Sequence, residues 1–186
     1  MEKIKFGPST HLYPKPAVLV GALVNEKPNF MTASWCGIAC QKPPAISIAI
    51  KKVRFTLKGI NQNGTFSINI PCTKLVRKVD YCGIYSGKDK DKSQIFKYFY
   101  GTLKTAPLID ECPINFECKV IHSLDLGSHI LVIGEIIETY IDKNRLSNEK
   151  PDAEKIDPLI YASGAMQYHQ MGEAIGKAYH IGKGLK

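Results

Sequence analysis

The chain has 186 residues and a formal net charge of +8, and its length and apolar content are those of one globular domain. Its lysines are dispersed and interleaved with acidic residues, so a lysine-rich surface explains the charge better than a nucleic-acid partner does. No apolar run reaches the ~20 residues of a membrane helix and the first residues lack a signal-peptide core, so we expect a cytoplasmic protein away from membranes.

The first predicted elements are strands. The apolar run Ala17–Val24, followed by turn-like residues at 25–28, predicts a buried strand. Residues 29–35 should form a second strand that pairs with the first as a hairpin. Residues 45–50 place isoleucines on one face and small residues on the other, which is the period of two that a strand requires.

The stretch 29–35, Asn-Phe-Met-Thr-Ala-Ser-Trp, combines small polar residues with the only tryptophan. Small residues let a ligand approach backbone N–H groups closely, and the Trp35 ring offers a flat wall. This pattern suits an aromatic, hydrogen-bonding cofactor such as a flavin. Tight packing around a core tryptophan would give the same pattern, so the stretch by itself leaves both interpretations open.

A short helix is predicted after Arg54, with Thr56 as its N-cap and Asn63-Gly64 as its end. A helix N-terminus offers free N–H groups and a positive dipole end, and these two side chains would add donors, so a phosphate could bind here. A capped surface helix with solvated lysines explains the same residues equally well.

Residues 65–70 alternate as a strand whose polar face carries Asn69, which could bind a ligand or face water. Helical spacing follows over 75–82. The polar loop 86–92 is either solvated or a turn that delivers the Lys92 ammonium to an anion. We assign no structure to 93–113.

Residues 115–120 alternate between apolar and polar side chains and predict a strand with one face in water. Residues 129–141 give the strongest strand signal, with two apolar faces, so this strand should be central or wrap a barrel. His129 opens it, either as a strand-end histidine in water or as a ring that donates to a cofactor. No second histidine stands at metal-ligand spacing, so no metal site is expected.

The C-terminal part begins with a charged surface loop over 144–158. The apolar residues from Tyr168 to Tyr179 follow helical spacing and predict a helical extension over 169–186, although two glycines weaken it.

A series of motifs therefore follows one order along the chain: Asn-x-Met-Thr-Ala-Ser-Trp at 29–35, Pro-Pro at 43–44, Arg-x-Thr at 54–56, Asn69 with Pro71, Gly83, Ser-Gly-x-x-x-Asp-Lys at 86–92, and His129 with Gly134-Glu135. This order resembles the flavin reductase-like proteins of the FMN-binding split-barrel superfamily, and in particular the flavoredoxin family. The resemblance runs from about residue 14 to about residue 168.

The resemblance implies a mainly β fold with short helices, namely a six-stranded antiparallel Greek-key split β-barrel. It implies one domain over 1–186, with its core at about 14–168. It also implies a homodimer with one FMN per subunit near the dimer interface.

The resemblance further assigns cofactor contacts to individual positions. Asn29 and residues 32–35 would line the isoalloxazine ring, and Arg54 and Thr56 would hold the phosphate. Lys92 would reach the phosphate or ribityl chain, and His129 with the loop 161–164 would close over the cofactor. The complete set is Asn29, Thr32, Ala33, Ser34, Trp35, Cys36, Arg54, Thr56, Asn69, Ser86, Lys92, His129, Tyr161 and Gly164.

The expected function is that of an FMN-dependent oxidoreductase of the flavoredoxin type, because the flavin carries the electron or hydride chemistry. No catalytic acid or base of the protein is required. NAD(P)H or a redox protein would be the electron donor. Alternatively, FMN is an exchangeable substrate reduced by NAD(P)H, although no Gly-x-Gly-x-x-Gly fingerprint is present. A nucleic-acid-binding barrel and a haem protein with His129 as ligand are minor alternatives.

Overall fold

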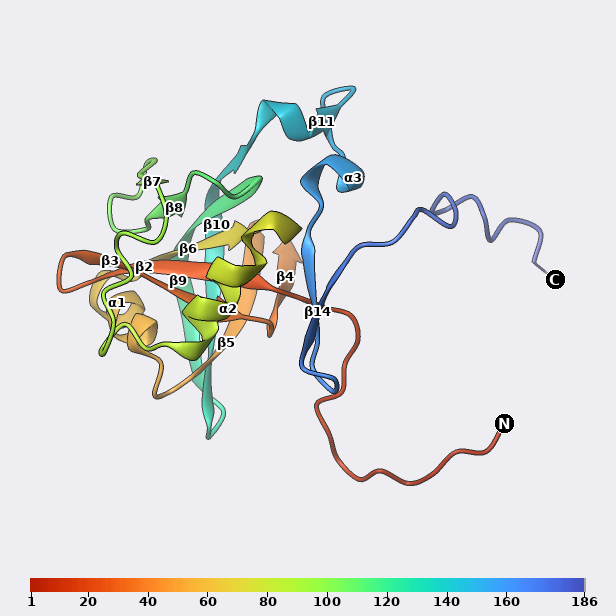
Figure 1. The fold of residues 1–186 in the computed structure, drawn as a ribbon, viewed down its shortest axis with the longest axis horizontal. Helices are drawn as coiled ribbons and strands as arrows, with labels where there is room; N and C mark the ends of the chain where they lie inside the picture. Colours follow the sequence, from red (N-terminus) through yellow and green to blue (C-terminus); the bar gives the residue numbers. More distant parts are fainter. Residues whose placement is uncertain (186) are drawn as a thin grey trace.

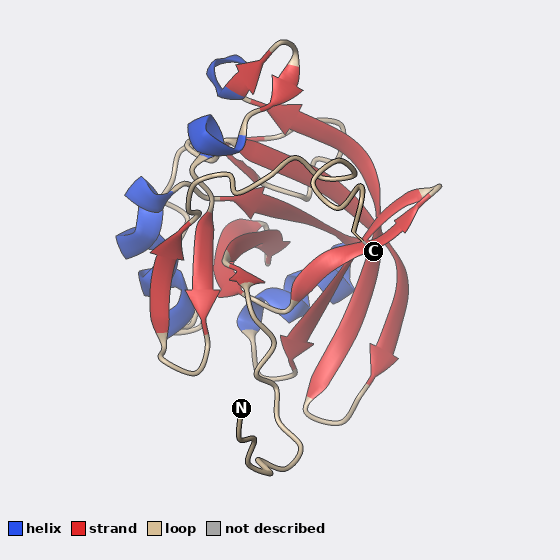
Figure 2. Cartoon of the chain, turned by 90° about the vertical axis from the view of Figure 1, so that its right-hand side faces the viewer, coloured by secondary structure: helices blue, strands red, loops and turns tan. Residues whose placement is uncertain are grey.

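The computed structural model describes residues 1–185 and is built on one antiparallel sheet that curls into a split barrel (Figures 1 and 2). Its strand order is β3-β2-β6-β9-β10-β5-β4. The strands are β2 (Val18–Val24), β3 (Lys27–Ala33), β4 (Cys36–Gln41), β5 (Pro44–Lys51), β6 (Thr65–Ile70), β9 (Ile114–Asp125) and β10 (His129–Ile141).

The predicted strands are confirmed, and the sheet contains one strand more than predicted. β2 and β3 form the expected hairpin, with Val20 opposite Met31. The strand over 129–141 is β10, which lies between β5 and β9 as its apolar faces indicate. β4 was not predicted and forms the edge beside β5, so the sheet has seven strands rather than six.

Two apolar clusters hold the sheet. The first fills the barrel with side chains such as Val18, Ile48 and Phe66. The second lies outside it, where Leu19 and Phe30 pack against the helix α2 (Val76–Ile84). β2 is therefore buried on both faces, as its uninterrupted apolar sequence indicates.

The polar face of β9 is only partly in water, because Lys119 is exposed as predicted and the other two polar residues are not. Asn115 and Glu117 are buried because the segment with the short strands β7 (Tyr98–Phe99) and β8 (Leu108–Ile109) covers them. The Glu117 carboxylate accepts N–H bonds from Thr102 and Leu103 at 3.0 and 2.9 Å. A buried carboxylate is tolerated when its oxygens are hydrogen-bonded in this way.

Asn69 is also buried rather than on a wet face. Its amide donates to the Leu19 carbonyl at 3.1 Å, and its oxygen accepts from the Ile109 N–H at 2.9 Å and from Asn115 at 2.8 Å. The side chain thus ties three strands and the covering segment together, because each buried polar atom has a protein partner.

The helix α1 (Phe55–Asn63) ends as predicted at Gly64, which adopts a left-handed conformation. Its N-cap is Arg54, so the prediction of Thr56 as N-cap is wrong. Thr56 lies in the first turn, and its buried hydroxyl accepts a hydrogen bond from the Asn29 amide at 2.7 Å. A one-turn 3₁₀ helix, η1 (Thr73–Leu75), precedes α2.

Segments from both ends of the chain form a second, three-stranded sheet. It contains β1 (Lys15–Pro16), β13 (Leu159–Ala162) and β14 (Gln167–Gln170), with Lys15 opposite Tyr161. The predicted loop over 144–158 contains short elements, namely η2 (Lys143–Arg145), β11 (Leu146–Ser147), β12 (Lys150–Pro151) and α3 (Ala153–Ile156).

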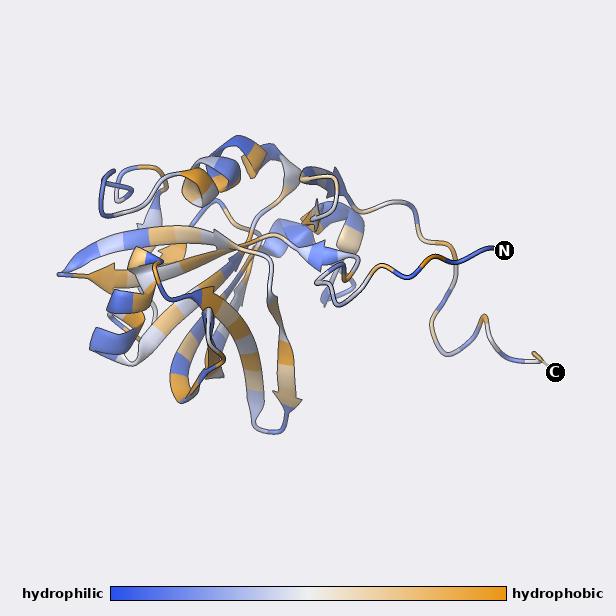
Figure 3. Ribbon diagram, turned by 90° about the horizontal axis from the view of Figure 1, so that it is seen from below, coloured by the Kyte–Doolittle hydropathy of each residue, from blue (hydrophilic) through white to orange (hydrophobic). Residues whose placement is uncertain are grey.

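The predicted C-terminal helix over 169–186 is wrong for the residues that the structure describes. Gln167–Gln170 is a strand, residues 171–185 contain no helix, and residue 186 lies outside the description. Most helical stability comes from packing one apolar face, and residues 171–185 are all exposed, so they bury no such face in this chain. Figures 1 and 3 show it and the N-terminal residues extending away from the barrel, with apolar positions along both.

No helix among residues 1–185 is both long enough and apolar enough to cross a membrane.

Candidate functional site

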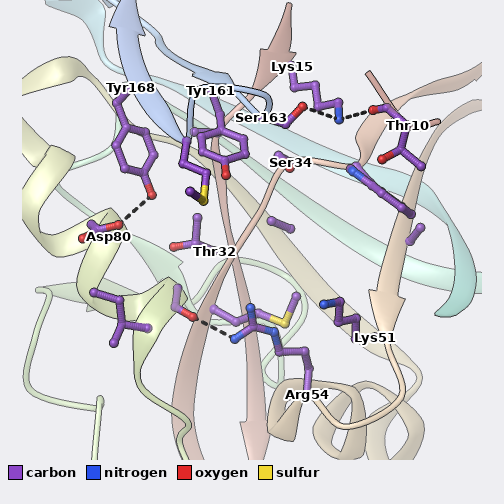
Figure 4. Close-up of a pocket in the computed structure, with 18 of the residues that line it drawn as sticks. Thr10, Lys15, Thr32, Ser34, Lys51, Arg54, Asp80, Tyr161, Ser163 and Tyr168 are labelled. Atoms are coloured by element: carbon purple, nitrogen blue, oxygen red, sulfur yellow. Dashed lines mark hydrogen bonds between the residues drawn. The ribbon is translucent and has the colours of Figure 1, made fainter. Parts of the chain in front are cut away.

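A cavity of about 630 Å³ opens where the two sheets, α1 and α2 converge (Figure 4). Its wall comes from the end of β3 and the residues after it, its sides from β5, β10 and α2, and its cover from the three-stranded sheet. Among the predicted positions, it is lined by Thr32, Ala33, Ser34, Trp35, Arg54, His129 and Tyr161.

The wall formed by residues 32–35 is held rigidly. The Thr32 hydroxyl donates to the Val79 carbonyl in α2. Trp35 stacks on His129, with ring centroids 4.6 Å apart and an interplanar angle of 20°. The histidine Nδ1 lies 2.8 Å from the Ser128 hydroxyl. Trp35 is therefore a partly exposed, braced aromatic surface at the cavity rather than a core residue.

Cations gather at the opposite end of the cavity, where α1 begins and α2 ends. Arg54 donates from Nη1 to the Gly83 carbonyl at 2.9 Å, and Lys51 lines the cavity beside it. Lys92 reaches the same helix end and donates to the Tyr85 and Cys82 carbonyls at 2.9 and 3.4 Å. Cations are stabilising at a helix C-terminus, where the dipole is negative. Burial lowers the pKa of the Lys92 ammonium, and nearby Arg54 lowers it further.

A smaller cavity of about 370 Å³ contains another part of the predicted set. Asn29, Gly87 and Lys92 line it, and Asn29 binds Thr56 there. A Cβ atom on Gly87 would lie 1.9 Å from the Asn29 amide oxygen, so this position has room only for glycine. Thr56 and Lys92 therefore do not line the main cavity. Lys92 nevertheless lies near Arg54, because both side chains bind carbonyls at the C-terminal end of α2.

The remaining predicted residues lie away from the main cavity. The polar atoms of Asn69 are already engaged in buried hydrogen bonds, and Cys36 packs against the barrel core. The Ser86 hydroxyl accepts the Lys88 N–H at 3.2 Å, and the Gly164 N–H donates to the Tyr13 hydroxyl at 2.6 Å. Gly164 nonetheless belongs to the β13–β14 turn that covers the cavity, next to Ser163.

Several lining residues were missed by sequence reasoning, above all in the cover. Tyr168 donates to the Asp80 carboxylate of α2 at 3.1 Å, which fastens the cover to the helix. Burial and Asp80 raise the pKa of Tyr168, so the phenol remains a donor at neutral pH. Lys15 and Ser163 lie opposite this pair in the cover. Nothing in the periodicity of the sequence marks these residues, because the cover forms only when distant segments meet.

The family model for the flavin reductase like domain matches residues 10–170 of this chain. The chain belongs to the flavin reductase-like family.

Solved structures and a curated relative agree with this family. The structure of flavoredoxin from Methanosarcina acetivorans is 40% identical, with a TM-score of 0.97 over 100% of both chains. Flavoredoxin of Desulfovibrio vulgaris is 38% identical, with a TM-score of 0.90 over 98% of this chain and 100% of that one. An uncharacterized protein of Archaeoglobus fulgidus is 32% identical over 76% of this chain and 80% of its own.

The thiol of Cys36 should be unreactive although it follows the cavity wall directly. Burial raises its pKa from an ordinary value of 9.0 to about 12, and the thiolate is the nucleophile. We expect iodoacetamide at pH 8 to alkylate the exposed Cys40 in the folded chain and to leave Cys36 unmodified.

In urea both cysteines should react, because unfolding removes the burial that raises the pKa. Mass spectrometry of tryptic peptides measures each site. Rapid labelling of Cys36 in the folded chain would contradict the assigned burial.

Proposed function

We propose that this chain binds FMN in the main cavity and acts as an FMN-dependent oxidoreductase of the flavoredoxin type. The observation that carries the proposal is a single cavity with a backbone-lined aromatic wall at one end and cations beside a helix N-terminus at the other. The solved flavoredoxins, at 40% and 38% identity over almost the full chain, support it.

The wall fits the ring of the cofactor. Residues 32–34 have small side chains, so a planar ligand can approach their backbone groups, and Trp35 offers a flat surface braced by His129. Aromatic rings pack favourably against such surfaces. We assign ring contacts to Thr32, Ala33, Ser34 and Trp35.

The cationic end fits the phosphate. The first N–H groups of α1 have no partners within the helix and favour an anion. Arg54 uses one of its five N–H donors for the Gly83 carbonyl, and other donors remain available for a ligand. Lys51 adds a second cation in the same cavity, whereas Lys92 lies outside it and binds the carbonyl end of α2. We assign the phosphate contacts to Arg54, Lys51 and the start of α1.

FMN, when bound, supplies the hydride and single-electron chemistry. The residues of the chain bind and orient the cofactor, and the cover with Tyr161 and Tyr168 shields it from water. We assign no acid–base step to a protein side chain.

The alternative function is a reductase that uses NAD(P)H to reduce FMN and then releases it. Rapid mixing of the FMN-loaded chain with NADH and with NADPH separates the two. If the chain is a flavoredoxin-type protein that keeps its FMN bound and takes electrons from another donor, we expect the flavin absorption band to persist with both nucleotides on the timescale of seconds. Fast bleaching by either one would establish the reductase instead.

The placement of the phosphate can be tested with matched charge deletions. We expect Arg54→Gln and Lys51→Gln, which change the two cations that line the main cavity, to weaken FMN by roughly tenfold or more, because each removes a charge-assisted hydrogen bond. Both should affect riboflavin little because it has no phosphate. Lys58→Gln removes the same charge from an exposed position of α1 and should change neither affinity.

Isothermal titration of both ligands, together with the absorption spectrum of the purified chain, gives these values. Equal losses for FMN and riboflavin would place the phosphate elsewhere. A chain without a flavin band that also fails to take up FMN would remove the proposed function.

We also propose that the chain forms a homodimer. The β9–β10 hairpin exposes Leu124 and Leu126, and the C-terminal segment exposes Ile175 and Tyr179 almost completely. Large exposed apolar surfaces of this kind are typical of protein–protein interaction sites. The similarity to the solved flavoredoxin covers both chains entirely at a TM-score of 0.97, so it includes the extended terminal segments. A second copy that packs against these segments would bury their exposed apolar side chains.

The double variant Ile175→Ser/Tyr179→Ser should therefore raise the dimer dissociation constant by roughly tenfold or more, through lost apolar burial. Lys177→Ser, in the same exposed segment, is the matched control and should leave the dimer intact. Sedimentation velocity over a range of concentrations measures both. A full-length chain that remains monomeric at all concentrations would refute the dimer.

A further inference from the structure

Lys15 is a buried cation whose role the proposed function leaves unexplained. Its side chain is 4% exposed, and its ammonium donates to the Thr10 carbonyl at 2.6 Å and to the Ser163 hydroxyl at 3.0 Å. Both partners are neutral. None of the ion pairs formed within residues 1–185 includes Lys15.

The position of Lys15 separates it from the cations assigned to the phosphate. Figure 4 shows Lys15 with Ser163 and Thr10 at one end of the cavity, and Arg54 with Lys51 at the other. Those two cations match the roughly two negative charges of a phosphate monoester. Among residues 1–185, Asp80 is the only carboxylate that lines the cavity, and it accepts from Tyr168 on the α2 side.

A buried ammonium is costly unless an opposite charge or a full set of hydrogen bonds compensates it. Lys15 has three N–H donors and two acceptors, so one donor remains for a ligand. Since Ser163 accepts from Lys15, its own hydroxyl proton is free to donate. The pair therefore presents two donors, on atoms 3.0 Å apart, to one end of the cavity.

From this arrangement we propose that Lys15 and Ser163 form an anion subsite for a second ligand, which carries a carboxylate and binds beside the cofactor. Two neighbouring donors match the two oxygens of one carboxylate. Trp35, whose ring centroid lies 5.7 Å from the Lys15 Nζ, and Tyr161 flank the subsite and favour a planar, aromatic acid. The proposal rests on the proposed function, since the cofactor occupies the remainder of the cavity.

The test compares benzoate with benzamide, which has nearly the same shape and no charge. Each is titrated into the FMN-loaded chain, and binding is followed by the difference spectrum of the flavin. We expect Lys15→Met to weaken benzoate by roughly tenfold or more, the loss of one charge-assisted hydrogen bond, and to leave benzamide unchanged. Lys15→Arg should retain most of the benzoate affinity, and Ser163→Ala should lose part of it.

Lys104→Met is the matched control. Its ammonium also donates to a backbone carbonyl at 2.6 Å, but the side chain is exposed and does not line the cavity. Circular dichroism and FMN affinity of each variant show whether the fold is retained. If Lys15→Met unfolds the chain, Ser163→Ala alone tests the subsite. This variant must then still lower the affinity for benzoate relative to that for benzamide.

The subsite would be refuted by equal losses for benzoate and benzamide, or by no loss. A Lys15→Met variant that weakens FMN more than riboflavin would also refute it, since Lys15 would then hold the cofactor phosphate. If the chain binds no FMN, the proposed function fails separately. The benzoate titration can then be repeated through the fluorescence of Trp35, the only tryptophan of the chain.

Discussion

The carbonyl end of α2 is the feature on which the candidate site depends. Its last turn carries partial negative charge, and two cations bind it: Arg54 from the start of α1 and Lys92 from the end of the polar loop. One turn earlier, Asp80 accepts from Tyr168 and so fastens the cover. A single helix end thus fixes the positions of the cationic end, the loop and the cover relative to the barrel.

The barrel supplies rigidity, and it does so with polar as well as apolar groups. Asn69 and Glu117 are fully buried, and each is satisfied by several protein partners, which ties β6 and β9 to the covering segment. Fully satisfied networks of this kind specify one arrangement. The cavity differs from this background because Lys15 is also buried but has hydrogen-bond acceptors for only two of its three N–H donors. The buried groups of the scaffold have several protein partners each, whereas the buried ammonium at the cavity keeps one donor without an acceptor.

The sequence predicted the barrel strands well and the polar positions poorly. Alternation located the strands 65–70 and 129–141, because the period of side chains along a strand depends only on its own residues. The same reasoning gave Asn69 a ligand or water as its partner and made Thr56 an N-cap. Both errors arose because a polar residue is compatible with water, with a ligand or with a buried partner, and only the neighbouring segments decide which one it meets.

The order of motifs along the chain by itself determined the family, and local periodicity determined most strands and both principal helices. Only the tertiary structure decided that residues 32–35 form a cavity wall, that β4 completes the sheet, and that the C-terminal segment is extended. It alone placed Lys15 against Ser163, which is 148 residues away. The physical reason is that burial and charge compensation are properties of contacts between distant segments, which no local pattern of residues encodes.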